Sequence, residues 1–155
     1  MSTAVRFEVR RASTPQELAE ALKLRHDVFC VEQGVPEREE VDGRDHEGLH
    51  LVAVAVDANA EDGQGELLGT CRLVMVGRTV QFSRLAVKTS ARRRGIATAL
   101  LEMADTETRA AGGRRLVLHA QTYARRLYDH AGYAPRGSVF REAGIEHIAM
   151  EKELS

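Results

Sequence analysis

The sequence contains no tryptophan and only two cysteines among its 155 residues, and its charges nearly balance. Because Cys30 and Cys71 are too few for a disulfide framework, we expect both to be reduced and to pack as small apolar residues. The net charge of -1 gives no overall basic field, so a nucleic-acid partner is not expected. No apolar run approaches a membrane-spanning length, so no membrane partner is expected either.

The start of the chain also lacks the pattern of an export signal, since no apolar segment follows a basic one. We therefore expect a cytoplasmic protein. Hydrophobic residues make up 43% of the chain, which is enough for a folded core. The length predicts a single domain over residues 1–155.

One stretch, residues 80–101, combines a strand, a basic loop and the start of a helix. Residues 80–87 alternate and end in an apolar run, as a buried strand does. Apolar residues then recur at helical spacing after Gly95, which follows three arginines at 92–94. The free amides and dipole of a first helical turn bind anions, and glycine lets a phosphate approach the backbone. We therefore predict a phosphate-binding turn at residues 92–97.

The other segments alternate between strand and helix patterns with short connections. Short connections between the second, third and fourth strands favour an antiparallel meander. The predicted fold class is α/β, with a mixed, mostly antiparallel central sheet and helices on both faces. The predicted strands are 5–9, 49–56, 67–76, 80–87, 116–120, 133–140 and 145–151, and the predicted helices are 14–33, 95–112 and 123–130, with an acidic loop over 34–48 and a turn over 59–65.

The spacing R-x-x-G-x-A of Arg92, Gly95 and Ala97 resembles the coenzyme A pyrophosphate loop of the GNAT acyltransferase superfamily. The order of the elements resembles the GNAT fold over nearly the whole chain. The segments LRHDVFCVEQGVP, DGRDHEGLHL and GIEHIAM most resemble the small ElaA-like branch. The resemblance implies an N-acetyltransferase in which an amine attacks the thioester of acetyl-CoA directly, without a covalent enzyme intermediate.

The resemblance also implies that two segments hold acetyl-CoA (coenzyme A) as cosubstrate. Amides of the phosphate-binding turn would hold the pyrophosphate. The strand edge at 85–87, opened by a splay from the next strand, would hold the pantetheine, with the acyl carbonyl on the amide of Leu85. Gln121 stands where many members have asparagine. The implied cofactor residues are Leu85, Ala86, Val87, Arg92, Arg93, Arg94, Gly95, Ile96, Ala97, Thr98, Gln121 and Tyr128.

Tyr128 stands at the family's position for the general acid that protonates the departing thiolate. An ordinary tyrosine pKa lies above that of a thiol, so the phenol keeps its proton at neutral pH. We interpret Tyr123 and Tyr133 as packing residues. The general base stays open among Glu32, the loop carboxylates (Glu40, Asp42 and Asp45) and His119. The candidate catalytic residues are therefore Tyr128, Glu32, Asp45 and His119.

The acceptor is expected to be a small-molecule primary amine, and the clustered loop carboxylates indicate a cationic one. An arginine within an apolar strand, such as Arg84, needs a carboxylate partner. We therefore expect Arg25, Asp45 and Arg84 to form a network that braces the acceptor pocket. The candidate acceptor residues are Arg25, Phe29, Asp42 and Arg84. Exposed strand edges in the final hairpin leave a homodimer open.

Parts of the sequence fit three alternatives. The first helix and loop also resemble acyl-homoserine lactone synthases, with Arg72 at comparable spacing, but Gln81 stands where those enzymes carry a glutamate. A non-catalytic acyl-CoA sensor would bind the cofactor without turnover. The segment from His46 to His50 reads H-E-x-x-H, which binds zinc only when both histidines share a helix face. Because Gly48 and a strand pattern interrupt that segment, no metal is predicted.

Overall fold

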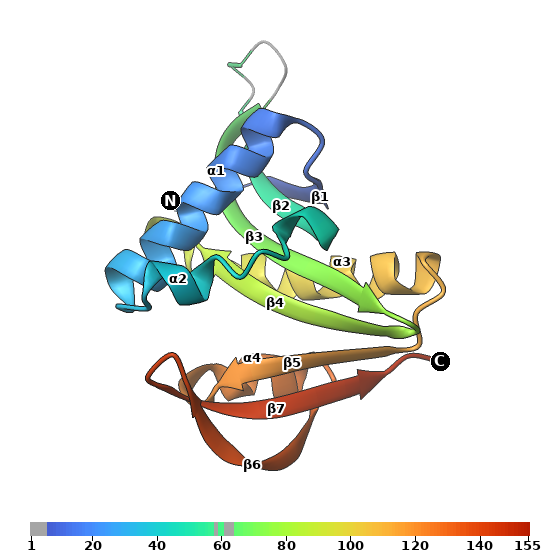
Figure 1. Ribbon diagram of the computed structural model, residues 1–155. Helices are drawn as coiled ribbons and strands as arrows, with labels where there is room; N and C mark the ends of the chain where they lie inside the picture. Colours follow the sequence, from blue (N-terminus) through green and yellow to red (C-terminus); the bar gives the residue numbers. More distant parts are fainter. Residues whose placement is uncertain (1–5, 58, 61–63) are drawn as a thin grey trace.

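The computed structural model describes residues 6–57, 59–60 and 64–155, and these residues form a seven-stranded sheet in the order β1-β2-β3-β4-β5-β7-β6 (Figure 1). Neighbouring strands are antiparallel except for β4 and β5, which are parallel. The predicted fold class is therefore confirmed. The strands are β1 Phe7–Arg11, β2 Leu49–Val56, β3 Gln64–Val76, β4 Thr79–Val87, β5 Arg115–Gln121, β6 Ala134–Glu142 and β7 Ile145–Glu153.

Helices cover both faces of the sheet, as predicted. Figure 1 shows α1 and α2 on one face and α3 and α4 on the other. The bounds are α1 Pro15–Arg25, α2 Glu37–Glu40, α3 Ile96–Ala110 and α4 Arg125–His130, with a π-helix η1 at His26–Glu32 and 3-10 turns η2 Asp45–Glu47, η3 Thr89–Ala91 and η4 Thr122–Ala124. Parts of two predictions, the start of the strand at 5–9 and the middle of the turn at 59–65, lie outside the described residues.

The first helix begins as its sequence predicts but changes its winding halfway. Thr14 caps it, since the hydroxyl accepts a hydrogen bond of 3.0 Å from the amide of Glu17. After Arg25 the chain continues as η1, in which the amide of Gln33 reaches back five residues to the carbonyl of Val28. Such π turns are rare and often lie at functional sites.

Each face of the sheet has its own apolar core. Ala21, Leu24 and Val28 pack with residues of β2, β3 and β4 beneath α1. The larger core lies beneath α3 and α4 and includes the buried Cys71. Both cysteines are free, as predicted. None of the helices in the described ranges is long and apolar enough to cross a membrane.

Candidate active site

The sheet opens between its two parallel strands. The β4–β5 ladder ends at Gln81 and Val117, and both strands continue beyond it without pairing to each other. Figure 1 shows the two strands diverging from this point. The splay that the family resemblance implied is therefore present. It leaves one edge of β4 around Leu85 without a ladder partner among the described strands.

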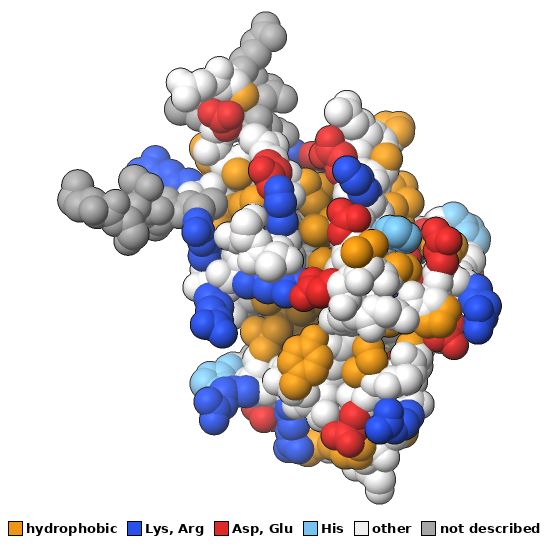
Figure 2. Space-filling model, turned by 90° about the vertical axis from the view of Figure 1, so that its left-hand side faces the viewer, with side chains coloured by type: hydrophobic (Ala, Val, Ile, Leu, Met, Phe, Trp, Pro, Cys, Tyr) orange, Lys and Arg blue, Asp and Glu red, His pale blue; other side chains and the backbone are white. Residues whose placement is uncertain are grey.

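A cavity of ≈ 880 Å³ occupies this opening. Its walls come from β4, β5, η1, α2 and the β6–β7 hairpin. Figure 2 shows the open end, where apolar side chains lie between groups of charged side chains. Predicted site residues that line the cavity are Phe29, Asp42, Arg84, Leu85, Val87, Arg92, Ala97, His119, Gln121 and Tyr128.

The turn before α3 has the geometry of an anion-binding helix start. Gly95 caps the helix in a left-handed conformation, with a φ of 83°. The first helical hydrogen bond joins the amide of Ala99 to the carbonyl of Gly95 (3.0 Å), so the amides of residues 96–98 have no acceptor within the helix. A Cβ atom built on Gly95 would meet no atom within 4 Å, so the backbone is open to approach.

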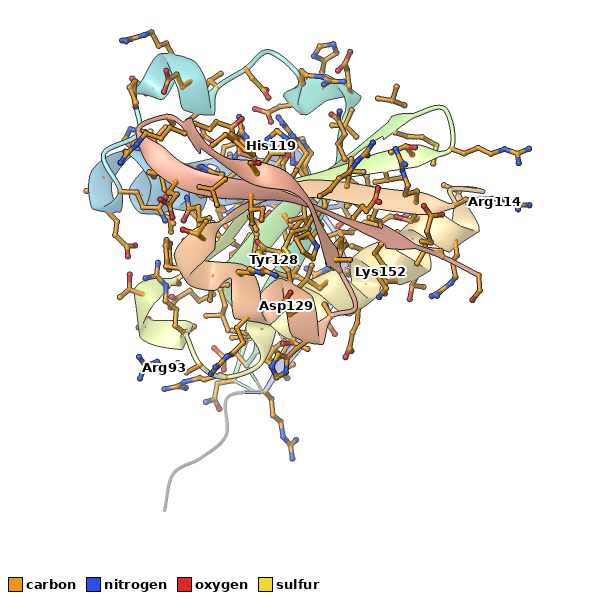
Figure 3. All side chains as sticks on the ribbon, turned by 90° about the horizontal axis from the view of Figure 1, so that it is seen from below. Arg93, Arg114, His119, Tyr128, Asp129 and Lys152 are labelled. Carbon is orange, nitrogen blue, oxygen red and sulfur yellow. The ribbon has the colours of Figure 1, made fainter. Side chains whose placement is uncertain are left out.

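The three arginines of the turn have different surroundings. Arg92 binds both carboxylate oxygens of Glu32 (2.6 and 2.7 Å) and donates to the carbonyl of Val87 (3.1 Å), so its guanidinium ties η1 to the end of β4. Arg93 and Arg94 are exposed. In Figure 3, Arg93 lies at the outer end of the turn. Arg93 and Arg94 are thus the guanidinium groups of the turn that face solvent.

Tyr128 reaches the cavity from α4. Its ring lies edge-to-face against Phe82 and Tyr133, and the residue is 8% exposed. Burial raises the pKa of the Tyr128 phenol above its ordinary value, so the group keeps its proton at neutral pH. Figure 3 shows Tyr128 on the α3/α4 side of the sheet and His119 on the α1/α2 side. Side chains from both faces of the sheet thus line one cavity.

Two glutamines bridge the mouth of the opening. Gln121 at the end of β5 and Gln33 at the end of η1 exchange hydrogen bonds of 2.9 and 3.3 Å through their amides. Gln33 also donates to the hydroxyl of Tyr123 (3.1 Å). Tyr123 is 76% exposed, so its interpretation as a packing residue was wrong, whereas Tyr133 is buried as predicted. Gln33 was not identified as a site residue from the sequence, which predicts a regular α-helix there. A π turn changes the direction of the side chain at the helix end.

An arginine–carboxylate network joins α1 and the following loop to β3 and β4. Arg25 pairs with Glu40 and Asp45 (both 2.7 Å), and Arg72 pairs with Asp42 (2.8 Å) and Asp45 (2.9 Å). The predicted network is present, but its membership differs. The remaining ion pairs of the network, both at 3.3 Å, join Arg84 to Glu40 and Asp42 rather than to Asp45.

The network changes two sequence interpretations. Arg25 is 1% exposed and lies behind the cavity wall, so it braces the wall and does not itself contact a ligand there. The three loop carboxylates face three arginines, so their charge is balanced within the protein. The clustered loop carboxylates therefore do not by themselves indicate a cationic acceptor, and the charge of the acceptor stays a prediction.

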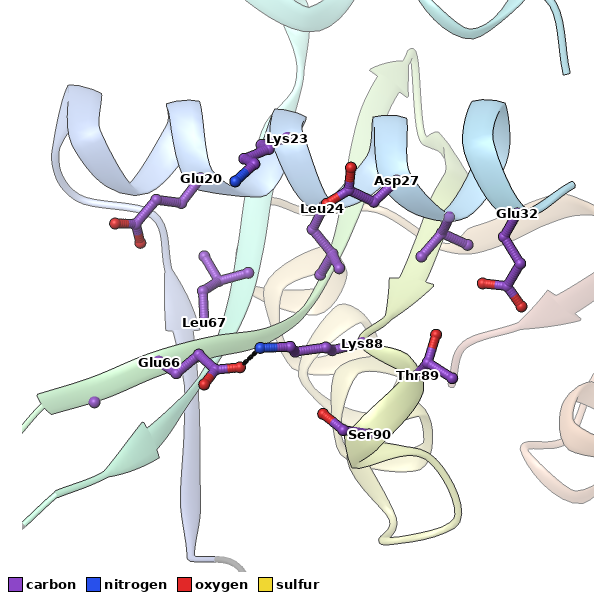
Figure 4. A pocket seen from close by; sticks show the side chains of 12 residues that line it. Glu20, Lys23, Leu24, Asp27, Glu32, Glu66, Leu67, Lys88, Thr89 and Ser90 are labelled. Atoms are coloured by element: carbon purple, nitrogen blue, oxygen red, sulfur yellow. Dashed lines mark ion pairs between the residues drawn. The ribbon is translucent and has the colours of Figure 1, made fainter. Parts of the chain in front are cut away.

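Glu32 and Asp45, two of the candidate bases, lie outside the cavity lining. Hydrogen bonding to Arg92 lowers the pKa of Glu32. Burial acts to raise the pKa of Asp45, but Arg25 and Arg72 lower it overall. Glu32 instead borders a second cavity of ≈ 520 Å³ between α1 and the ends of β3 and β4, where Lys88 pairs with Glu66 (Figure 4). The assignment of Glu32 and Asp45 as candidate bases is therefore corrected, because both carboxylates lie outside the cavity and are paired with arginines.

His119 lies on β5 at the cavity and is 54% exposed at its side chain. Its Nδ1 atom lies 3.2 Å from Glu142 of β6, and Nε2 of His147 of β7 lies 3.8 Å from the same carboxylate. Sequence reasoning missed Glu142 and His147 as site residues. The one feature of the sequence that could have identified His147 is its place in the segment GIEHIAM, which resembles the ElaA-like branch.

The H-E-x-x-H segment is not a helix. His46 lies in η2 and His50 in β2, where its Nε2 atom lies 2.8 Å from the carbonyl oxygen of Asp45. The two rings therefore do not share the helix face that such a zinc site requires.

Comparison with known proteins agrees with this architecture. The family model of the acetyltransferase (GNAT) domain matches residues 16–154. The chain is 30% identical over 152 residues to the uncharacterised protein YyaT of Bacillus subtilis, covering 96% of this chain and 97% of that one. The solved structure of an acyl-CoA N-acyltransferase from Pseudomonas aeruginosa is 28% identical, with a TM-score of 0.75 over 96% of this chain and 99% of that one. Escherichia coli ElaA is 25% identical, with a TM-score of 0.76 over 96% and 100%. The chain belongs to the GNAT acetyltransferase family.

Proposed function

We propose that this transferase moves an acetyl group from acetyl-CoA to a primary amine of a small molecule. The observation that carries the proposal is the opening between β4 and β5, which contains the cavity and ends beside the free amides of the α3 turn. The name of the Pseudomonas aeruginosa relative, an acyl-CoA N-acyltransferase, supports an acyl-CoA donor. Acetyl-CoA would supply the acetyl group as an activated thioester.

The residues present suit such a donor. The unpaired edge of β4 at Leu85 and Val87 offers backbone groups to the amides of an extended chain, as an added strand would. The amides of residues 96–98, with Arg93 and Arg94 beside them, suit a pyrophosphate. Gln121 can bind a pantetheine amide after exchanging its bonds with Gln33.

Tyr128 is the proposed proton donor to the leaving sulfur. Its phenol lines the cavity and carries a proton whose loss burial opposes. Its hydroxyl has no hydrogen-bond partner from the part of the chain that the structure describes. A hydroxyl that faces a cavity and lacks a protein partner is free to donate to a ligand.

His119 is the proposed acceptor of the amine proton. It lines the same cavity as Leu85 and Tyr128, in contrast to Glu32 and Asp45. The proposed acceptor carries a positive charge. The carboxylate of Glu142 supports this, because it lines the cavity and lies outside the arginine network. An acceptor with a net negative charge as the best substrate would contradict this.

Calorimetric titration with acetyl-CoA tests the donor, and thiol release with a panel of putrescine, tyramine, glucosamine and a lysine-containing tetrapeptide tests the acceptor. We expect 1:1 binding of acetyl-CoA and release of coenzyme A that depends on an amine. Binding without turnover of any amine would instead support an acyl-CoA sensor. Absence of binding would overturn the proposed function.

A further inference from the structure

A histidine–carboxylate–histidine cluster lies at the cavity edge where β5 meets the β6–β7 hairpin. Nδ1 of His119 lies 3.2 and 3.4 Å from the two oxygens of Glu142. Nε2 of His147 lies 3.8 Å from one oxygen of the same carboxylate. All three side chains line the cavity, and His147 is 7% exposed.

An aromatic ring between the two histidines fixes their planes. Phe140 lies edge-to-face against His119, with ring centroids 5.0 Å apart and an angle of 78°. The same ring stacks on His147 at 5.9 Å and 21°. Because Phe140 pairs with His147 across the hairpin and Glu142 lies two residues further along β6, one register places both contacts. The His119 ring is thus held by a T-shaped contact with Phe140 and through one nitrogen.

Hydrogen-bond chemistry then determines which nitrogen of His119 is bare. An ionised carboxylate only accepts hydrogen bonds, so Nδ1 of His119 must carry the hydrogen that faces Glu142. A neutral imidazole with a hydrogen on Nδ1 has a lone pair on Nε2. Nδ1 of His147 also carries a hydrogen, because it lies 2.7 Å from the carbonyl oxygen of Ile145, which can only accept.

We propose that Glu142 is a positioning residue that holds His119 as the Nδ1–H tautomer, so that Nε2 of His119 takes a proton from the ammonium group of the acceptor. This proposal rests on the proposed function. Acetylation of an ammonium group yields an amide, a thiol and one proton. His119 passes that proton to solvent, to which it is open, and the second proton lost by the nitrogen replaces the one that Tyr128 gives to sulfur.

The first test reads the tautomer directly and needs no acceptor. In ¹⁵N-labelled protein at pH 8, long-range ¹H–¹⁵N spectra distinguish a protonated from a bare ring nitrogen, and His119→Gln identifies the signal. We expect Nδ1–H in the wild type and a shift toward Nε2–H in Glu142→Leu. Glu146→Leu, on the same hairpin but outside the cavity lining, is the matched control. An Nε2–H tautomer in the wild type would overturn the proposal.

The second test separates positioning from packing by kinetics with acetyl-CoA and the fastest amine of the panel. We expect His119→Ala and Glu142→Leu to lower kcat by about 100-fold, with the KM for acetyl-CoA unchanged. Added imidazole should restore part of the activity of His119→Ala only. If the wild type turns over and both variants keep its kcat, this inference fails while the proposed function stands. If the wild type binds acetyl-CoA but acetylates no amine, the proposed function and the proton transfer to His119 fail together, and the tautomer test still decides whether Glu142 holds His119 as the Nδ1–H tautomer.

Discussion

At the scale of single residues, Tyr128 gives the most direct test of the chemistry. Tyr128→Phe keeps the ring contacts with Phe82 and Tyr133 but removes the proton, so kcat should fall by about 100-fold or more while the KM for acetyl-CoA changes little. Steady-state kinetics by thiol release measures this. Tyr133→Phe is the matched control, because its buried hydroxyl has no partner in the described structure and lies outside the cavity lining. A Tyr128→Phe enzyme with the wild-type kcat would remove Tyr128 from the mechanism.

Gly95 gives a second residue-scale prediction. Gly95→Asp places a carboxylate beside the amides proposed to hold the pyrophosphate and strains a backbone φ of 83°, so calorimetry should detect no acetyl-CoA binding. Circular dichroism should still show the folded protein.

The chain provides a control for the strain alone. Gly112, near the other end of α3, has a φ of 82° and equally open surroundings. Gly112→Asp should therefore lose at least as much stability, since its carboxylate also lies at the negative end of the α3 dipole, yet bind acetyl-CoA as the wild type does. Equal loss of binding in both variants would mean that strain, and not charge at the turn, explains the Gly95 result.

The residues that sequence reasoning found and missed differ in how they are positioned. Tyr128 and Gly95 lie within short segments whose spacing is itself informative. Glu142 and His119 are 23 positions apart, and they meet only through the order β5-β7-β6, in which the last strand pairs with β5. The sequence predicted a terminal hairpin, but nothing local determines which of its strands joins the sheet. The cluster was therefore beyond a reading of local patterns.

At the scale of elements, the packing of α3 on β3 couples the core to the phosphate-binding turn. A Cβ atom on Gly69 of β3 would lie 2.8 Å from Cγ2 of Ile96, the first residue of α3. Gly69→Ala should therefore lower the free energy of unfolding by about 1–3 kcal/mol through overpacking. It should also weaken acetyl-CoA binding, because α3 moves at the end that carries the free amides.

A double variant tests that cause. Ile96→Ala removes the clashing methyl group, so Gly69→Ala should cost less in the Ile96→Ala background than in the wild type. Denaturant unfolding of the four proteins gives the coupling free energy. Strictly additive costs would show that Gly69 acts through some other contact.

The helices show where periodic patterns are informative and where they are not. Hydrophobic spacing located α1 and α3, and the cap at Thr14 located the start of α1. Hydrophobic spacing predicted neither the π winding of η1 nor the helix α2. A π turn widens the winding without changing which residues are apolar, and α2 spans only four residues, too few for a period.

At the scale of the whole molecule, the outer edge of the sheet bears on assembly. β6 is the outermost strand next to β7, so the homodimer considered from the sequence would pair along it. A register shift between Arg136 and Phe140 interrupts that edge, and Gly137 there has a φ of 80°. Bulges of this kind hinder pairing between edges, so a homodimer through β6 would have to form around the bulge. Analytical ultracentrifugation of the wild type compared with a variant that deletes Gly137 would test this.

The arginine–carboxylate network connects α1, the loop, β3 and β4, so its protonation should affect the stability of the whole fold. Hydrogen bonding to Arg72 holds the pKa of Asp42 well below its ordinary value of 3.8. The pKa of Asp45 is also lowered, because Arg25 and Arg72 outweigh the effect of burial. Between the folded and unfolded pKa values, the unfolded chain binds more protons than the folded one. The stabilisation is therefore fully present above about pH 5 and is lost as the pH falls below the ordinary carboxyl pKa.

Asp42→Asn isolates this contribution. At pH 7 the variant should be less stable than the wild type, since Arg72 loses an ionised partner at 2.8 Å. The difference should shrink as the pH falls from 5 to 2, because Asp42 then becomes protonated in the unfolded wild type while it stays ionised in the folded one, which lowers the free energy of unfolding of the wild type alone. Glu102→Gln, an exposed change on α3, should show no such convergence. Urea unfolding at each pH measures the free energies, and a difference that stays constant with pH would mean that Asp42 stabilises the fold by packing rather than by its charge.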